Sequence, residues 1–304
     1  MEKTLRDTIK EITKKHLKKF KSMVFGQNLT GVGWVDNTLP KLYEKDGIIE
    51  LPMADVADGG IVTGAGLMGK RPFYIIRYQG YNWFNMIFIV NYACKTKEIW
   101  KKPCPIFIRG IALEGNIGPV SGSSQISIFY KMPNIKIFSP MSSNEYKFVY
   151  KKFLNSDDVF YVSEHRKSFS NKLNLKNSLP KNPDIVLMPI SVTRFEAEEV
   201  KNYFDKKKIK VGIMHLWKLK PFNLSNKDYK YLKKSKYGVL MTDNDFKDGL
   251  MSILASKIQT RSRISKFFFM GLKDKTAGHH TNVDNIPPRA SEIISKINQI
   301  IKNN

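Results

Sequence analysis

Asp55 is the carboxylate whose neighbours in the sequence most suggest chemistry. A strand-like segment ends near Pro52, and an apolar, glycine-rich stretch that is predicted to be helical follows Asp55 and runs to Gly69. A carboxylate at such a position either caps the N-terminus of the helix or is a functional group that faces a cleft. The residues alone favour the cap and leave the functional role open.

The glycines of Gly64–Gly69 match the G-x-G-x-x-G pattern of dinucleotide-binding loops. That pattern needs a strand before it, a helix after it and an acid about twenty residues further on. Here Lys70-Arg71-Pro72 and a strand follow, and residues 84–92 contain no acid. We therefore interpret these glycines as positions where a helix packs closely against its neighbours.

Two other clusters contain residue types that are common in active sites. Ser121–Ser124 lacks the G-x-S-x-G elbow that exposes a nucleophilic serine, so it indicates a small-residue loop. His279 and His280 have no third metal ligand at a recognisable spacing, which favours a solvated pair. We therefore predict no metal ligands in this chain.

Short β-branched segments alternate with helical stretches, a pattern typical of mostly parallel sheets with helices on both faces. We predict an α/β fold of two such domains, at residues 1–167 and 184–304, with a polar linker at 168–183. The expected strands are Met23–Phe25, Phe73–Arg77, Pro105–Arg109, Ile135–Phe138, Val159–Val162, Ile185–Ile190, Lys210–Met214, Val239–Thr242 and Lys266–Met270. The expected helices are residues 4–21, Gly60–Met68, Trp83–Lys95, Asn144–Leu154, Phe195–Lys207, Ser225–Lys234, Asp248–Thr260 and Ala290–Ile301.

The composition of the 304 residues bounds the class of protein. The formal net charge of +24 comes mostly from lysine, whereas readout of phosphates and base edges favours arginine, and no nucleic-acid-binding motif is present. The lysine runs therefore indicate solvated helix faces, and we expect no nucleic-acid partner.

The longest apolar run, Trp83–Tyr92, is too short to span a bilayer. With only Cys94 and Cys104, the chain is expected to be a reduced, cytoplasmic protein without a membrane partner.

Several short motifs, in order and at matching spacing, resemble the β subunit of thiamine-diphosphate-dependent 2-oxoacid dehydrogenases and, more widely, the C-terminal half of transketolases. The resemblance covers nearly the whole chain. The segments that carry it are Val24-Phe25-Gly26-Gln27-Asn28, Pro52-Met53-Ala54-Asp55, Gly60–Ala65, Arg71-Pro72, Asn91–Lys95, Pro105–Gly110, Ser139-Pro140, Val162–Arg166 and Leu216–Pro221. It implies a pyrimidine-binding domain followed by a transketolase-type C-terminal domain.

The resemblance also implies a cofactor and site residues. In the family, a carboxylate at the position of Asp55 bonds N1′ of the aminopyrimidine and so promotes removal of the C2 proton of thiamine diphosphate. Tyr81 falls where an aromatic ring stacks on the pyrimidine, and Gln27 lies in the turn after the opening strand. Arg109, in the P-I-x-x-R-G strand, is expected to be structural. The G-D-G…N motif for Mg²⁺ and diphosphate is missing, so an α-type partner subunit is expected to bind them.

The sequence departs from the family pattern at three of its functional positions. Asp55 replaces a glutamate and is one methylene shorter, and Gln27 replaces the glutamate of the family turn. Ser123 stands where a histidine normally assists proton or acyl transfer, so a hydroxyl replaces an imidazole that titrates near neutral pH. Ser123 is therefore retained only as a site-lining candidate.

These features favour one function and leave two alternatives open. We expect the β-type subunit of a heteromeric transketolase-like enzyme that makes or breaks a C–C bond in a 2-oxoacid or ketose. The alternatives are the E1 β subunit of a 2-oxoacid dehydrogenase and a non-catalytic partner subunit of the same fold. Self-association is expected in each case.

Overall fold

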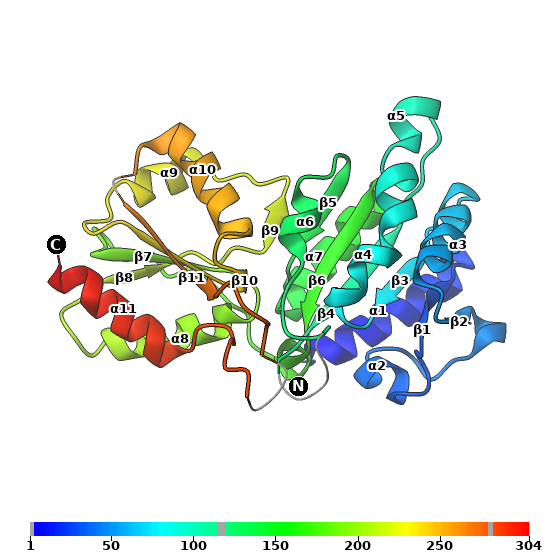
Figure 1. Ribbon diagram of the computed structural model, residues 1–304, viewed down its shortest axis with the longest axis horizontal. Helices are drawn as coiled ribbons and strands as arrows, with labels where there is room; N and C mark the ends of the chain where they lie inside the picture. The colour runs from blue at the N-terminus through cyan, green and yellow to red at the C-terminus, as the bar shows by residue number, and fades with distance from the viewer. Residues whose placement is uncertain (1–2, 115–119, 265, 279–281, 304) are drawn as a thin grey trace. The chain divides into compact units, whose positions relative to one another are not determined.

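The computed structural model describes residues 3–114, 120–264, 266–278 and 282–303. The chain divides into two compact units. The first extends to Leu113 and includes Val120–Asn174, and the second contains Leu175 and the residues after it. The two units are coloured from blue to green and from green to red in Figure 1.

The first unit is built on a parallel sheet whose strands have the order β2-β1-β3-β4-β6-β5. The strands are β1 (Val24–Gln27), β2 (Ile48–Leu51), β3 (Phe73–Ile76), β4 (Phe107–Ala112), β5 (Ile135–Phe138) and β6 (Val159–His165). The central strands β3, β4 and β6 are entirely buried, as expected for parallel strands that are covered on both faces, whereas the edge strand β2 is partly exposed.

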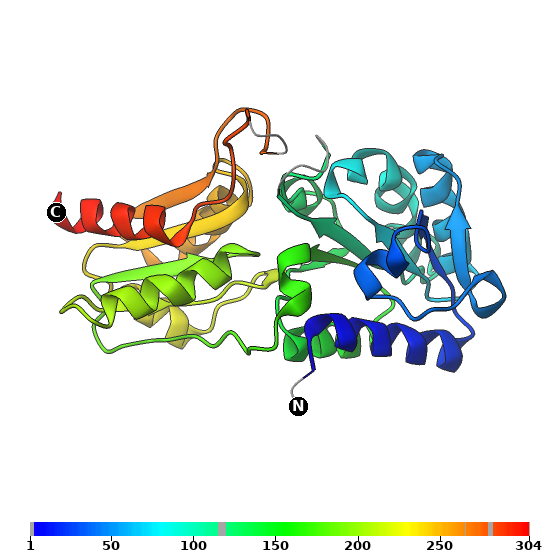
Figure 2. The same ribbon diagram turned by 90° about the horizontal axis from the view of Figure 1, so that it is seen from below.

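Helices cover both faces of this sheet, α1 and α7 on one and α3, α4 and η3 on the other (Figure 2). The helices are α1 (Leu5–Phe20), α2 (Gly33–Asn37), α3 (Asp55–Leu67), α4 (Asn82–Asn85), α5 (Thr96–Trp100), α6 (Ile126–Tyr130) and α7 (Ser143–Leu154). Single turns, η1 (Glu44–Asp46), η2 (Gln79–Tyr81), η3 (Ile89–Ala93) and η4 (Arg166–Ser170), connect them.

The helix that the sequence predicts over Trp83–Lys95 is present but is not one regular α-helix. The segment forms the short helix α4 and then the π-helical turn η3. Polar side chains on α4 explain the break, because Asn82, directly before the apolar run, and Asn85, inside it, are buried and bond groups within the unit. Asn82 donates to the Tyr161 hydroxyl at 2.7 Å and Asn85 to the Tyr81 carbonyl at 2.9 Å.

A buried ion pair ties the centre of the sheet together. Arg109 on β4 donates to both carboxylate oxygens of Glu164 on β6, at 2.7 and 2.8 Å, and both side chains are fully buried. The Tyr146 hydroxyl donates to the same carboxylate at 2.8 Å. Because a buried charge is costly unless it is paired, these bonds fit the structural role expected of Arg109.

The second unit has a smaller parallel sheet of order β11-β10-β7-β8. Its strands are β7 (Ile185–Pro189), β8 (Val211–Ile213), β10 (Val239–Phe246) and β11 (Phe267–Leu272), and the short strand β9 (Lys218–Lys220) follows β8. Helices α8 (Thr193–Phe204) and α11 (Ala290–Lys302) cover one face, and α9 (Asn226–Leu232) and α10 (Leu250–Ser262) the other (Figure 1). The predicted α/β architecture, with a mostly parallel sheet in each domain, is confirmed.

None of the helices in the described parts of the chain is long and apolar enough to cross a membrane.

Candidate functional site

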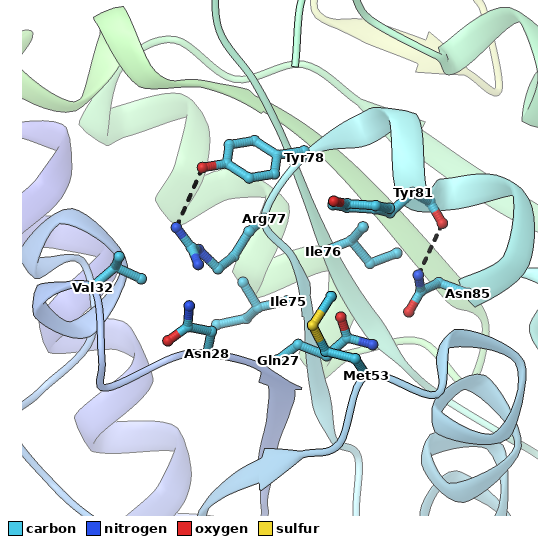
Figure 3. Close-up of a pocket in the computed structure, with 10 residues that line it drawn as sticks. All are labelled: Gln27, Asn28, Val32, Met53, Ile75, Ile76, Arg77, Tyr78, Tyr81 and Asn85. Atoms are coloured by element: carbon cyan, nitrogen blue, oxygen red, sulfur yellow. Dashed lines mark hydrogen bonds between the residues drawn. The ribbon is translucent and has the colours of Figure 1, made fainter. Parts of the chain in front are cut away.

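A cavity of about 340 Å³ lies in the first unit, where strands β1 and β3 end. Figure 3 shows Tyr81 and Asn85 at one end of it and Arg77 and Tyr78 at the other. The carboxyl ends of parallel strands are the usual place for ligands in open α/β sheets. The residues that line the cavity are Gln27, Asn28, Val32, Met53, Ile75, Ile76, Arg77, Tyr78, Tyr81 and Asn85.

Glu50, on β2, fixes the loop that follows β1. Its carboxylate accepts hydrogen bonds from the backbone N–H groups of Leu29 and Thr30, at 2.8 and 2.6 Å, and from the Thr30 hydroxyl at 2.7 Å. The loop begins at Asn28, which has a positive φ of 53°. These bonds hold the Asn28 side of the cavity in one conformation.

Asp55 lies next to the cavity, one hydrogen bond behind its lining. The Gln27 side chain, at the end of β1, donates through Nε2 to Asp55 Oδ1 at 2.6 Å. The capping role that the residues favoured is wrong. Asp55 is the first residue of α3, the N-cap position is Ala54, and no side-chain capping bond is formed there among the described residues. The carboxylate is therefore available for another role.

Asp58 is a second carboxylate at the same place, and the sequence analysis missed it. Gln27 Nε2 also donates to Asp58 Oδ2, at 2.6 Å, so one amide group joins both carboxylates. Asp58 is fully buried, and this burial is the main reason why its pKa is raised, with a smaller contribution from the negative charge of Asp55. Its spacing of three from Asp55 places both on one helix face, which is the signal that could have revealed it.

The aromatic end of the cavity is fixed from behind by Asn85. The Tyr74 hydroxyl donates to Asn85 Oδ1. Asn85 Nδ2 in turn donates to the Tyr81 carbonyl, as Figure 3 shows. Burial raises the pKa of Tyr74, so its hydroxyl keeps its proton as a donor at neutral pH. Tyr81, predicted as a cofactor-binding residue, is thus a lining residue whose backbone is held in place.

The opposite end of the cavity is cationic. The guanidinium of Arg77 lies over the Tyr78 ring, 5.3 Å from its centroid, and donates to the Tyr78 hydroxyl at 3.4 Å. No carboxylate among the described residues forms an ion pair with Arg77. The cavity therefore offers a positive group to an anionic ligand.

Ser123 is not part of the cavity lining within the described part of the chain. Its hydroxyl accepts a hydrogen bond from Gln125 Nε2 at 3.0 Å, and the Gln125 backbone donates to Gln79 at 2.8 Å. The loop around Ser123 is nevertheless attached to η2, because Gly80 donates to the Val120 carbonyl at 3.0 Å. The structure thus joins Gln27, Tyr81 and Asp55 at one site and leaves Ser123 beside it.

The other sequence motifs lie away from this site. The predicted close helix packing holds for Gly66 of α3, where a Cβ would be 2.7 Å from Cys104 Sγ. It is wrong for Gly64 and Gly69, because a Cβ on either would have no described neighbour within 4 Å. No group of three or more side chains that could hold a metal ion occurs in the described ranges. His279 and His280 lie outside the described residues.

Residues 2–171 match the family described as transketolase, pyrimidine binding domain. The 2-oxoisovalerate dehydrogenase subunit beta of Bacillus subtilis (strain 168) is 25% identical over 154 residues, 48% of this chain and 46% of that protein. The pyruvate dehydrogenase E1 component subunit beta of Staphylococcus epidermidis is 24% identical over 173 residues, 55% of this chain and 53% of that protein. The chain thus spans about half the length of these relatives.

Two solved structures share the fold over nearly the whole chain. One is a split-gene transketolase, described as an inactive β4 tetramer, with a TM-score of 0.72, 13% identity and 98% of each chain covered. The other is the transketolase of Campylobacter jejuni, with a TM-score of 0.76, 17% identity, and 97% of this chain and 46% of that chain covered. At these identities the likeness concerns the fold alone.

Proposed function

This chain belongs to the family of the transketolase pyrimidine-binding domain, and on that premise we propose that it is the β-type subunit of a heteromeric, thiamine-diphosphate-dependent enzyme. The reaction would make or break a C–C bond next to a carbonyl group. One observation carries the proposal: Asp55 is bonded to Gln27 in the wall of a cavity that the Tyr81 ring also lines.

The residues present fit the aminopyrimidine part of this cofactor. A flat, polar aromatic ring needs an aromatic or apolar wall on its faces and hydrogen-bonding groups at its edge. Tyr81, Met53 and Ile75 supply the wall, and the amides of Gln27 and Asn85 supply polar edge groups. Asp55 is one methylene shorter than the family glutamate, and a hydrogen bond joins its carboxylate to Gln27, which lines the cavity.

Each side chain then has a definable task. Tyr81 would stack on the pyrimidine, which contributes on the order of 1 kcal/mol beyond burial. Ile75, which is buried, would exclude water on its side of the cavity, and this strengthens the electrostatic effect of Asp55. Asp55 would hold a negative charge, or a proton, beside the ring nitrogen. The bound cofactor would supply an electron sink for the carbanion formed at the substrate carbonyl carbon.

The partner would supply the diphosphate half of the site. This sequence lacks the G-D-G…N motif, so we assign diphosphate and Mg²⁺ to an α-type subunit. An apolar surface on α3, α4 and η3, which pack together, supports such an assembly, because exposed apolar patches commonly mark protein interfaces. We define this apolar surface by the exposed residues Val56, Ile61, Leu67, Trp83, Phe84 and Tyr92.

The substrate would be a 2-oxoacid or a ketose, and Arg77 favours an anionic one.

Two alternatives remain within the proposal. The similarity to dehydrogenase β subunits favours an E1 β role, whereas Ser123, in place of the family histidine, favours a non-catalytic partner subunit.

Binding of the cofactor tests the proposal. Isothermal calorimetry should detect no appreciable binding of thiamine diphosphate and Mg²⁺ to the isolated chain. Tight, Mg²⁺-dependent binding should appear once the chain is mixed with a subunit that carries the G-D-G…N motif. Tight binding by the isolated chain would refute the divided site, and a complex that never binds the cofactor would favour the non-catalytic alternative.

A further inference from the structure

Asp58 is a buried carboxylate to which the proposed function gives no role. It lies in the first turn of α3, has no exposed surface, and faces groups from three elements of the first unit. These groups are Gln27 on β1, Asp55 on α3 and Tyr74 on β3.

A negative charge on Asp58 would be poorly compensated. Asp58 Oδ2 accepts from Gln27, but Oδ1 finds no hydrogen-bond partner among the described residues. The nearby Tyr74 hydroxyl donates to Asn85 instead. A buried ion that lacks partners is far more costly than a neutral acid with one unpaired group.

The charge of Asp55 makes ionisation of Asp58 still less favourable. Asp55 Oδ1 and Asp58 Oδ2 are each 2.6 Å from the same Gln27 nitrogen, so the two oxygens lie within about 5 Å of each other. No Lys or Arg forms a salt bridge with either carboxylate in the described part of the chain. Two carboxylates at such a separation resist carrying two charges.

We propose that Asp58 is a positioning acid, which keeps its proton at neutral pH and, through the Gln27 amide that it shares with Asp55, holds Asp55 as the single negative charge beside the cavity. Gln27 suits this role because both of its N–H groups can be used, one for each carboxylate. The raised pKa of Asp58, caused mainly by burial, agrees with the geometry. We infer the protonation of Asp58 from the structure of this chain alone, whereas its role in catalysis rests on the proposed function.

Carbon-13 NMR of the full chain, labelled at the aspartate side-chain carboxyl carbons, tests the protonation without any cofactor. One aspartate signal should titrate well above the usual value of about 4 and be lost in Asp58→Asn. Asp243, buried in β10 of the second unit, also has a raised pKa, mainly because of burial. Its carboxyl signal should therefore also titrate at a raised pH. Asp243→Asn is therefore the matched control, and it should leave the Asp58 signal in place.

Two further variants report on the shared amide. In Asp55→Asn the pH at the midpoint of the Asp58 titration should fall, because the neighbouring negative charge is gone. In Gln27→Leu it should rise, because the donor that stabilises the ionised form is gone. These shifts keep the test decisive if Asp58→Asn does not fold. The proposal is overturned if the signal lost in Asp58→Asn titrates near 4, or if the Asp58 midpoint does not respond to Asp55→Asn.

The catalytic consequence is tested separately, in the assembled complex. The affinity of the complex for thiamine diphosphate should decline as the pH rises and Asp58 ionises. This decline should be absent in Asp58→Asn. A complex that binds no cofactor, together with the expected titration, would refute the proposed function and leave the positioning acid standing. Cofactor binding with the same alkaline decline in wild type and Asp58→Asn would refute the role of Asp58 at this site.

Discussion

The Ser123 hydroxyl has a local partner in Gln125 and does not line the cavity in the described part of the chain. We expect Ser123→Ala to leave turnover of the assembled enzyme within a few-fold of wild type, since general acid–base assistance is worth about 10²–10⁴ where it is present. Steady-state kinetics measure the effect. A loss of two or more decades would mean that this serine takes part in proton transfer.

His16 on α1 makes the stability of the first unit dependent on pH. Its ring is fully buried, bonds the Arg71 carbonyl at 2.8 Å through Nε2 and contacts the Tyr150 hydroxyl at 3.1 Å through Nδ1. Burial lowers the pKa of His16 to about 4, from 6.5. The unfolded chain therefore binds the extra proton first, and stability is complete above pH 6.5 and is lost as the pH falls towards 4.

Urea denaturation between pH 7 and 4 measures this loss. The shift corresponds to at most about 3 kcal/mol of unfolding free energy, at 1.36 kcal/mol per pH unit. In His16→Gln, which keeps polar groups without a titrating ring, the decrease over this range should be smaller. An equal decrease in the two proteins would assign the pH dependence to other groups.

Among single residues, the resemblance to the family pointed to Gln27, Tyr81 and the functional role of Asp55. Tyr81 and Gln27 fall on the cavity, and Asp55 lies one hydrogen bond behind it. Asp58 was missed because a carboxylate in a glycine-rich helix resembles an exposed N-terminal acid, and its burial depends on β1, β3 and α4. Only the fold brings these elements together.

At the scale of elements, close contact between α3 and α4 positions the aromatic end of the cavity. A Cβ on Gly59 would be 2.3 Å from the Asn85 carbonyl oxygen, which belongs to α4. Gly59→Ala should therefore push α4 away, destabilise the unit by about 1–3 kcal/mol and disturb Tyr81. Gly64→Ala on the same helix is the matched control, because no described neighbour lies within 4 Å of the added carbon.

Urea denaturation of both variants separates packing from helix propensity. Gly64→Ala should be neutral or stabilise the chain by up to about 1 kcal/mol, since alanine is the better helix former. If Gly59→Ala were as stable as Gly64→Ala, the close approach of α3 and α4 would not determine the geometry of the cavity.

Strands and helices with a simple apolar period were predicted well, whereas an element with buried amides was not. Expected strand Ile135–Phe138 matches β5, and expected helix Ala290–Ile301 ends within one residue of α11. The apolar pattern of Trp83–Lys95 gave no sign that Asn85, and Asn82 directly before the segment, are buried and bond partners elsewhere in the unit. Periodicity reports which face is buried and carries no information about such partners.

At the scale of the whole molecule, the apolar surface should be covered in the functional assembly. Phe84 on α4 is 56% exposed, so Phe84→Asp should leave the isolated chain folded and weaken its association with the partner. Leu173→Asp is the control, since Leu173 is also exposed and lies far along the chain from this surface. Sedimentation velocity of the mixed subunits measures the assembly. Equal loss of assembly in both variants would argue against this surface.

The central claim is that Asp55 activates thiamine diphosphate held between this chain and its partner. Hydrogen–deuterium exchange at C2 of the bound cofactor, measured in the assembled complex, tests it most directly. Asp55→Asn keeps the size and polarity of the side chain and removes its charge, so the exchange rate should fall by at least about two decades while the fold is retained. Equal exchange rates in wild type and Asp55→Asn would contradict the claim.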